Sequence, residues 1–277
     1  MAGVRSVLLE GSAYLPHLAV AISPLATRLT EVEAIAIIPA RYASTRLPGK
    51  PLLAETGKPL IQHVVEAAQA SPSITRVVVA TDDPRICEAV RSFGGEAVMT
   101  SEKHTCGSDR IAEAISPDKL DLPDDGIIVN LQGDEPDIPP ECIDRLVNLT
   151  SSCGAHMATL ATPLSPDQAA DPGKVKVVVA LDGTAMYFSR AMIPHHRDGK
   201  STAGHLLHLG IYAYRAGFLR EYAALPATPA EEAEKLEQLR ALEHGYKIAV
   251  AVVDYSGSGI DTPEDYSAFV ARRGSGR

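Results

Sequence analysis

The chain has 277 residues, with 26 lysines and arginines against 35 aspartates and glutamates and therefore a formal net charge of −9 at pH 7. Hydrophobic residues make up 45% of the sequence and charged residues 22%, so the chain can bury a core and does not have the composition of a disordered protein. The acidic total argues against non-specific binding to nucleic acid or an anionic membrane, and no apolar run approaches the ~18 residues that span a bilayer, so we expect neither as a partner.

The first 33 residues precede the first segment with the pattern of a core element. Their apolar patch at residues 14–22 is interrupted by Pro16 and His17, and acidic residues are mixed with the basic ones. This pattern is poor for a secretory signal and weak for a transit peptide. We interpret residues 1–33 as an N-terminal extension of uncertain structure and residues 34–277 as one domain.

Short apolar runs alternate with helix-period segments through the first half of this domain. The run AIAIIPA is typical of a buried parallel strand, and from Ile61 apolar residues recur at i, i+3, i+4 and i+7, as on one face of a helix. Asp83 and Pro84 are the residue types that cap and open a helix. We predict strands at residues 34–40, 76–80, 96–100 and 127–131, with helices after residue 58, from 84, from 107 and around 143–147. This alternation predicts a doubly wound α/β sheet.

The second half of the chain changes character. Asp182 and Gly183 form a dipeptide suited to a tight hairpin turn between runs at 174–181 and 184–190, which predicts an antiparallel hairpin insertion. We predict further strands at 206–214 and 247–254, and helices that begin at residues 228–229 and 262–263. The expected fold is a three-layer αβα domain with one mixed, mostly parallel sheet.

A basic loop follows the first strand. Residues 39–50, PARYASTRLPGK, include Arg41, Arg46 and Lys50 and no acidic residue. Ligands of open α/β sheets bind outside the carboxyl ends of the strands, so this loop lies where a phosphate chain would bind, although it is not a Walker A motif. Arg41 and Lys50 can neutralise phosphates, and the small Ser44 lets the backbone approach a nucleotide. The alternative is an ordinary solvated loop.

Two acidic residues follow other predicted strands. Asp134 comes just after the strand at 127–131, and Asp261 lies beside a helix start after the last strand. Carboxylates at strand ends are good ligands for Mg²⁺, and two of them could hold metal against a triphosphate from opposite sides. For Asp261 alone, an ordinary acid near a helix N-terminus is an equally good explanation.

Other kinds of chemistry find less support in the sequence. The four cysteines lie far apart with no Cys-x-x-Cys pair, which favours a reducing cytoplasm over secretion and argues against a zinc finger. His205 and His208 would point to opposite faces of a strand, which also argues against zinc. Cys106 precedes a helix start but has no evident partner base, so we interpret it as a plain thiol.

Seven motifs in order carry a family resemblance. They are IIPARYASTRLPGKP from residue 37, ATDD from 80, VNLQGDEP from 129, YFSR from 187, HLGIY from 208, LEQL from 236 and DTPED from 261. From about residue 35 onward the chain resembles the 3-deoxy-manno-octulosonate cytidylyltransferase family. The resemblance implies a fold of the nucleotide-diphospho-sugar transferase kind and a homodimer. It also implies that CTP and 3-deoxy-manno-octulosonate (KDO) react to give CMP-KDO and pyrophosphate, for lipopolysaccharide synthesis.

The resemblance also implies roles for individual residues. Its metal carboxylates correspond to Asp134 and Asp261, which form the expected catalytic set together with Arg41 and Lys50. The implied CTP site comprises Pro39, Ala40, Arg41, Ser44, Lys50, Thr81, Asp83, Asp109 and Gln132. The implied sugar site comprises Gln132, Arg190, His208, Tyr212, Glu237 and Gln238. The chain departs from the family at Cys106, where serine is common.

Two other functions remain open from the sequence. A cytidylyltransferase for a related ulosonic acid, such as sialate or 8-amino-KDO, would differ mainly between residues 190 and 238. A non-catalytic nucleotide-binding or scaffold protein would lack the acidic pair, which this chain retains. We expect a cytoplasmic enzyme in which positioning and charge neutralisation, with no histidine base, promote nucleotidyl transfer.

Overall fold

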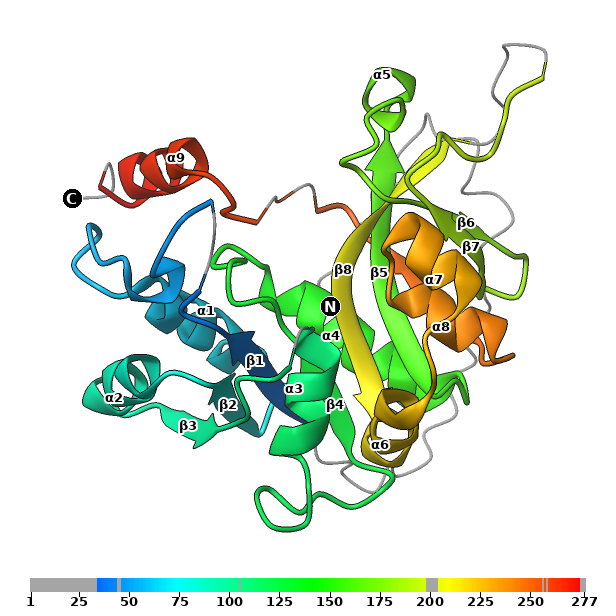
Figure 1. Ribbon diagram of the computed structural model, residues 1–277. Coiled ribbons are helices and arrows are strands. Elements are labelled where there is room, and N and C mark those ends of the chain that lie inside the picture. Colours follow the sequence, from blue (N-terminus) through cyan, green and yellow to red (C-terminus); the bar gives the residue numbers. More distant parts are fainter. Residues whose placement is uncertain are drawn as a thin grey trace, which may run out of the picture.

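The computed structural model describes residues 34–43, 46–104, 106–197, 204–255, 257 and 259–274. The N-terminal extension predicted at residues 1–33 and the predicted nucleotide contact Ser44 lie outside these described residues. The domain predicted from residue 34 onward can be followed from its first strand to its last helix (Figure 1).

Strands and helices alternate along the described chain. The strands are β1 (Ala34–Ala40), β2 (Arg76–Thr81), β3 (Glu96–Met99), β4 (Ile127–Asn130), β5 (Met157–Leu164), β6 (Lys176–Val179), β7 (Ala185–Ser189), β8 (His205–Arg215) and β9 (Ile248–Val252). The helices are η1 (a 3-10 helix, Lys50–Leu52), α1 (Leu60–Gln69), α2 (Pro84–Ser92), α3 (Gly107–Ala114), α4 (Pro140–Ser152), α5 (Pro166–Ala169), α6 (Ala216–Ala224), α7 (Pro229–Glu234), α8 (Gln238–Glu243) and α9 (Pro263–Gly274). None of the helices within the described ranges combines the length and the apolar character needed to cross a bilayer.

One mixed sheet runs through the molecule in the order β3-β2-β1-β4-β8-β5-β9. β1 pairs in parallel with β2 and β4, and β5 pairs in parallel with β9, whereas β8 is antiparallel to both of its neighbours, β4 and β5. All the strands on this path except β8 therefore share one direction, which confirms the predicted mixed, mostly parallel sheet. The antiparallel β6–β7 hairpin forms at the predicted insertion and joins the sheet through β8.

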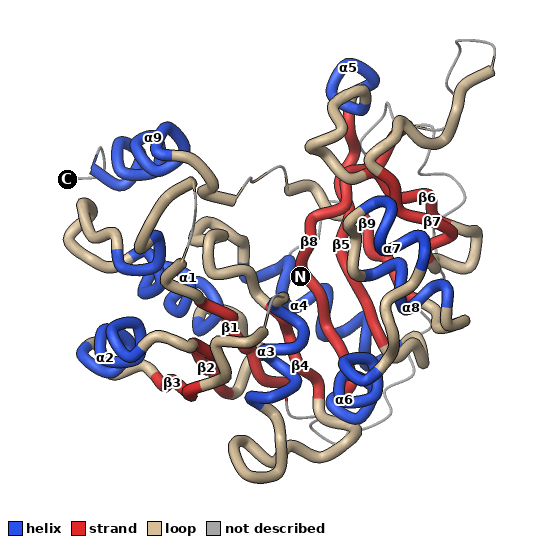
Figure 2. The backbone as a smooth tube through the Cα atoms, viewed as in Figure 1, coloured by secondary structure: helices blue, strands red, loops and turns tan. Residues whose placement is uncertain are grey.

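Alternating side chains of the strands build a core on each face of the sheet. In β1, Ala36 and Ile38 face the same core as Ile61 of α1, whereas Ile35 and Ile37 face the opposite core. Helices α1, α2 and α4 contribute to the first core and α3, α6 and α8 to the second, which confirms the three layers (Figures 1 and 2). A smaller apolar cluster joins α9 to α1 and to the basic loop.

The predicted helix starts form as their sequences indicate. Asp83 accepts a hydrogen bond from the Arg85 amide at 2.9 Å and so caps α2. Thr228 begins α7 with a capping box. Asp265 accepts from the Thr262 amide at 2.9 Å at the start of α9.

The sequence pattern did not predict β5, which lies between β8 and β9. Its sequence MATLATPL contains two threonines and a proline, so it lacks the run of branched apolar residues that marks a buried strand. Its polar groups are nevertheless satisfied, because the Thr159 hydroxyl donates to the Ile211 carbonyl at 2.7 Å. Helices α5, α6 and α8 were also not predicted. α5 and α8 are too short to show a clear period, and α6 begins after Arg215 with no side-chain cap.

Candidate active site

The carboxyl ends of β1, β2 and β4 meet at one edge of the sheet, where the sequence predicts a nucleotide-binding loop. Pro39 and Ala40 end β1 there, and Pro39 packs against the segments that follow β4 and begin α3. A Cβ atom on Gly133 would come within 3.1 Å of the Pro39 carbonyl oxygen, and one on Gly107 within 3.3 Å of the Pro39 ring. Two glycines therefore allow three separate motifs to close around the end of β1.

Lys50 joins the two carboxylates predicted to bind metal. Its ammonium nitrogen lies 2.7 Å from Asp134 Oδ2 and 3.4 Å from Asp261 Oδ1, and it donates to the Ile260 carbonyl at 2.9 Å. The Lys50 and Asp134 side chains are 15% and 26% exposed, so water screens this pair weakly, whereas Asp261 is 46% exposed and its pair is better solvated. Two acidic residues far apart in the sequence thus converge on one lysine, and their binding of metal stays a prediction.

Asp261 reaches the site from the connection between β9 and α9. The Ile260 amide donates to the Asp134 carbonyl at 2.9 Å, and the Asp261 amide donates to Asp265 Oδ2 at 3.1 Å. Ile260 is also buried in the small cluster beneath α9. Backbone hydrogen bonds and apolar packing fix the Asp261 carboxylate, whose second oxygen lies 3.3 Å from the guanidinium of Arg46.

The remaining residues predicted for CTP lie along the same edge. Thr81 is buried, and its hydroxyl accepts from the Asp83 amide at 3.2 Å. Hydrogen bonds from the Arg85 side chain lower the pKa of the Asp83 carboxyl, which is therefore engaged within the protein. Arg41 is exposed, and Asp109 is half-buried in the first turn of α3. Of these residues, Arg41 is the one whose charge faces solvent at the nucleotide edge.

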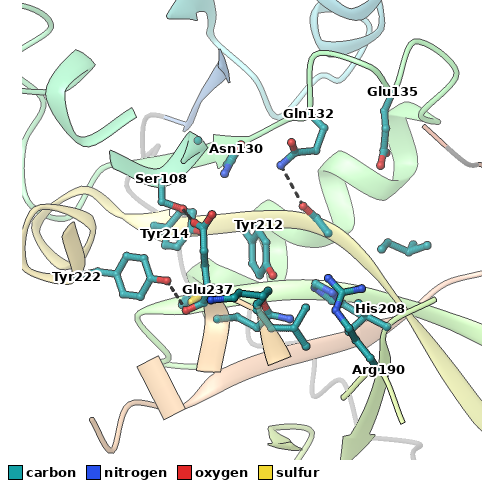
Figure 3. A pocket seen from close by; sticks show the side chains of 18 of the residues that line it. Ser108, Asn130, Gln132, Glu135, Arg190, His208, Tyr212, Tyr214, Tyr222 and Glu237 are labelled. Atoms are coloured by element: carbon teal, nitrogen blue, oxygen red, sulfur yellow. Dashed lines mark hydrogen bonds between the residues drawn. The ribbon is translucent and has the colours of Figure 1, made fainter. Parts of the chain in front are cut away.

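A cavity of about 520 Å³ lies beside the carboxylate pair (Figure 3). Its wall includes Asp261 and every residue predicted to contact the sugar. These residues come from the loop after β4, the end of β7, strand β8 and the α7–α8 turn, and are Gln132, Arg190, His208, Tyr212, Glu237 and Gln238. The structure brings the six side chains together, and their contact with a sugar stays a prediction.

Glu237 lies in the turn between α7 and α8. Lys235 has a left-handed φ of 54°, which ends α7 and lets the chain turn at the cavity wall. The Glu237 carboxylate accepts from the Ser108 hydroxyl at 3.1 Å, and its backbone carbonyl accepts from the Tyr222 hydroxyl at 2.7 Å (Figure 3). Burial raises the pKa of this carboxyl. A carboxylate held in this way is suited to accept hydrogen bonds from sugar hydroxyls.

Arg190 is fixed to the cavity wall by its backbone and its side chain. Its amide donates to Glu234 Oε2 at 2.9 Å, and its Nε donates to the Glu234 carbonyl at 2.8 Å. The fully buried Lys176 ammonium donates to the Arg190 carbonyl at 2.6 Å. A guanidinium anchored in this way is suited to pair with the carboxylate of a sugar acid.

A bulge in the pairing of β5 and β8 arranges the cavity-facing residues of β8. The register shifts between Thr159 and Ala161, and Gly210 in the opposite strand has a φ of 69°. His208 Nε2 lies 3.0 Å from the Thr159 hydroxyl, and the His208 ring lies 5.3 Å from the ring of Tyr212. Because this hydroxyl donates its own proton to a backbone carbonyl, we assign the His208 proton to Nε2.

Burial of His208 should make stability depend on pH. Burial lowers the pKa of this imidazole from 6.5 to about 3. Between pH 6.5 and about pH 3 the unfolded chain binds more protons at this histidine than the folded chain does. The free energy of unfolding therefore falls as the pH falls through this range. His208→Gln should therefore reduce the drop in unfolding free energy between about pH 7 and about pH 5, measured by urea denaturation. His244→Gln, at an exposed histidine, is the control and should leave the drop unchanged; equal slopes in wild type and His208→Gln would contradict the expectation.

Three polar atoms of residues that line the cavity have no hydrogen-bond partner among the described residues. They are the buried atoms Asn130 Oδ1, Glu135 Oε2 and Gln238 Nε2. Buried polar atoms are normally paired, so these atoms indicate a ligand with hydrogen-bonding groups. Burial raises the pKa of the Glu135 carboxyl to about 8. Asn130, Glu135 and Ser108 are not among the predicted site residues. Asn130 and Glu135 flank Gln132 in one strand-end motif, and this position was the signal that could have indicated them.

Comparison with known proteins identifies the family. The sequence pattern of the cytidylyltransferase family matches residues 35–248. A 3-deoxy-manno-octulosonate cytidylyltransferase from Anaeromyxobacter dehalogenans is 53% identical over 229 residues, which cover 83% of this chain and 93% of that protein. The chain belongs to the 3-deoxy-manno-octulosonate cytidylyltransferase family.

Two further relatives support this membership. A 3-deoxy-manno-octulosonate cytidylyltransferase from Nitratidesulfovibrio vulgaris is 47% identical over 237 residues, which cover 84% of this chain and 93% of that protein. The solved structure of a CMP:2-keto-3-deoxy-manno-octonic acid synthetase complexed with CTP matches with a TM-score of 0.82 and 44% identity, over 88% of this chain and 99% of that one. The resemblance drawn from the seven motifs is confirmed.

Proposed function

We propose that the protein transfers the cytidylyl group of CTP to 3-deoxy-manno-octulosonate and releases pyrophosphate, as a step in lipopolysaccharide synthesis. The observation that carries this proposal is the shared wall of one cavity. All six predicted sugar contacts line it together with Asp261, and Lys50 links Asp261 to Asp134 beside it. The family membership and the CTP complex of a related protein support the same reaction.

The chemistry follows from charge and position. The anomeric hydroxyl of the sugar loses its proton to solvent water, and its oxygen bonds to the α-phosphorus of CTP. The bond from that phosphorus to the oxygen that bridges to the β-phosphorus breaks, and pyrophosphate leaves with the electron pair. Nucleotidyl transfer depends mainly on positioning and charge neutralisation, which Arg41 and Lys50 would provide for the phosphates. Arg190 would pair with the sugar carboxylate and Glu237 would accept from its hydroxyls. Near neutral pH the His208 imidazole is uncharged, and its one N–H, at Nε2, is held in a hydrogen bond. His208 would therefore act as a fixed neutral contact.

Mg²⁺ is the cofactor that we propose for this site. The donors fit a cation, because oxygens of Asp134 and Asp261 already converge on one ammonium group. No group of three or more His, Cys, Asp or Glu side chains that could hold a metal exists among the described residues, so water and phosphate oxygens would complete the ligand set, as Mg²⁺ prefers. When bound, Mg²⁺ acidifies a hydroxyl and offsets phosphate charge.

A homodimer and a cytoplasmic location complete the proposal. Met186 and Tyr187 on β7 and Met192 just after it are large apolar side chains with exposed fractions of 63%, 39% and 42%. Exposed apolar groups gathered on one segment favour burial against a second copy of the chain. The four cysteines are free thiols, which supports a reducing compartment. Sedimentation analysis of wild type and Met186→Glu tests the dimer, since the charge should shift the protein toward the monomer.

The activity can be tested directly. Pyrophosphate release should be measured with each of the four nucleoside triphosphates against a panel of ulosonic acids that includes KDO, 8-amino-KDO and sialate. We expect turnover with CTP and KDO to exceed that of every other pair. Faster turnover with another ulosonic acid would reassign the sugar, and no pyrophosphate release with any pair would overturn the proposed function.

A further inference from the structure

The Lys50 ammonium fully occupies the point where the two carboxylates converge. An ammonium has three N–H donors. Three acceptors surround this one: Asp134 Oδ2 at 2.7 Å, the Ile260 carbonyl at 2.9 Å and Asp261 Oδ1 at 3.4 Å. Arg46 lies 3.3 Å from the other oxygen of Asp261. Two cations therefore balance the two carboxylates.

A metal ion would need the same carboxylate oxygens. Mg²⁺ binds oxygen at about 2.0–2.1 Å, so an ion on Asp134 Oδ2 would lie against an ammonium that is itself 2.7 Å from that oxygen. Repulsion between the two positive groups would be strong in this half-buried place. Lysine and metal therefore compete for one position, and metal alone must displace an ammonium that would keep only the Ile260 carbonyl as a partner.

The backbone of Lys50 is fixed in the loop, and its ammonium is carried at the end of a flexible four-carbon stem. Gly49, with a φ of 66°, opens η1, and the Leu53 amide donates to the Lys50 carbonyl at 3.2 Å. The long lysine stem still allows the ammonium to move without any change in this turn. The same loop follows the end of β1, where we expect the nucleotide to bind. There the phosphate oxygens would offer the Lys50 ammonium new acceptors.

We propose that Lys50 is an exchangeable cation, which neutralises Asp134 and Asp261 in the free protein and transfers to the triphosphate when metal and nucleotide arrive together. This inference rests on the proposed function. The exchange would make the binding of metal and nucleotide mutually favourable, because the nucleotide gives the Lys50 ammonium a new partner while the metal takes the position that the ammonium leaves. Such coupling typically changes affinity by about 5- to 150-fold.

The test is metal binding in the absence of nucleotide. Mn²⁺ is used in place of Mg²⁺, and free Mn²⁺ is counted by electron paramagnetic resonance with wild type, Lys50→Met and Arg46→Met. We expect Lys50→Met to bind Mn²⁺ about tenfold more tightly than wild type and to bind CTP more weakly. Arg46→Met is the matched control, because it removes the same charge from an exposed side chain that contacts Asp261 alone among the two carboxylates. It should change the Mn²⁺ affinity much less.

The outcomes separate this inference from the proposed function. Equal Mn²⁺ affinity in wild type and Lys50→Met, or equal tightening in Lys50→Met and Arg46→Met, would overturn the exchange. Equal Mn²⁺ affinity of wild type and Asp134→Asn in the presence of CTP would instead overturn the metal site itself. A crystal structure of wild type with Mn²⁺ and CTP needs no variant. There the Lys50 ammonium should contact a phosphate oxygen, and an ammonium still bound to Asp134 would refute the exchange.

Discussion

Asp134→Asn should lower kcat by about 10³-fold, equivalent to ~4 kcal/mol of transition-state stabilisation, while the fold is retained. The substitution keeps the shape of the side chain and removes the charge that faces Lys50 and, in the proposed mechanism, the metal. Pyrophosphate release measures the loss, and circular dichroism checks the fold. Asp137→Asn is the matched control, since Asp137 pairs with Arg272 and Arg273 at the surface. Its kcat should stay close to that of wild type.

Asp261→Asn should cause a loss of similar size, and the double variant should be little worse than either single one. Non-additive losses are expected when two residues serve one shared group. A near-native kcat for Asp261→Asn would reduce that residue to an acid at a helix start. Fully additive losses would show that the two carboxylates act separately.

Glu237→Ala should raise the KM for the sugar by about 10- to 100-fold and leave the KM for CTP nearly unchanged. The expected size is that of a hydrogen bond between a charged group and a hydroxyl, about 1.5–3 kcal/mol. Glu237 lines the cavity, and the Ser108 and Tyr222 hydroxyls hold it there. Initial rates with each substrate varied in turn give the two constants. The surface variant Glu232→Ala should change neither, and equal changes of both constants in Glu237→Ala would contradict the assignment.

The first half of the fold was predictable because local signals agree there. The apolar run of β1 and the Asp83-Pro84 helix start each indicate the element that forms. β1, β2 and β4 are mostly apolar runs that are buried on both faces, so their limits are visible in the sequence, whereas β3 is a half-exposed strand at the edge of the sheet. The site residues at the ends of β1 and β4 followed from the rule that ligands bind at such edges.

The second half depends on contacts that the sequence does not display. β5 carries Thr159 and Pro163 inside the sheet, and its stability comes from β8 and β9 on either side. The position of Glu237 depends on the left-handed backbone conformation of Lys235, which a lysine in the sequence does not indicate. The ion pairs of Lys50 could not be predicted either, because both partner carboxylates arrive from distant parts of the chain. Ser44 and residues 1–33 stay predictions.

The order of strands in the sheet divides the two recognition tasks between successive stretches of the chain. The nucleotide edge is built from β1, β2 and β4, whereas most of the cavity wall comes from the hairpin, from β8 and from the α7–α8 turn. Mutations in those three segments alter the cavity and leave the basic loop untouched. A lineage could therefore acquire a different acceptor acid by changes in the second stretch alone while it keeps the same activated donor. Such divergence would be constrained from both sides at Asp261, which contacts Lys50 of the first stretch, and at Gln132, which is predicted for both substrates.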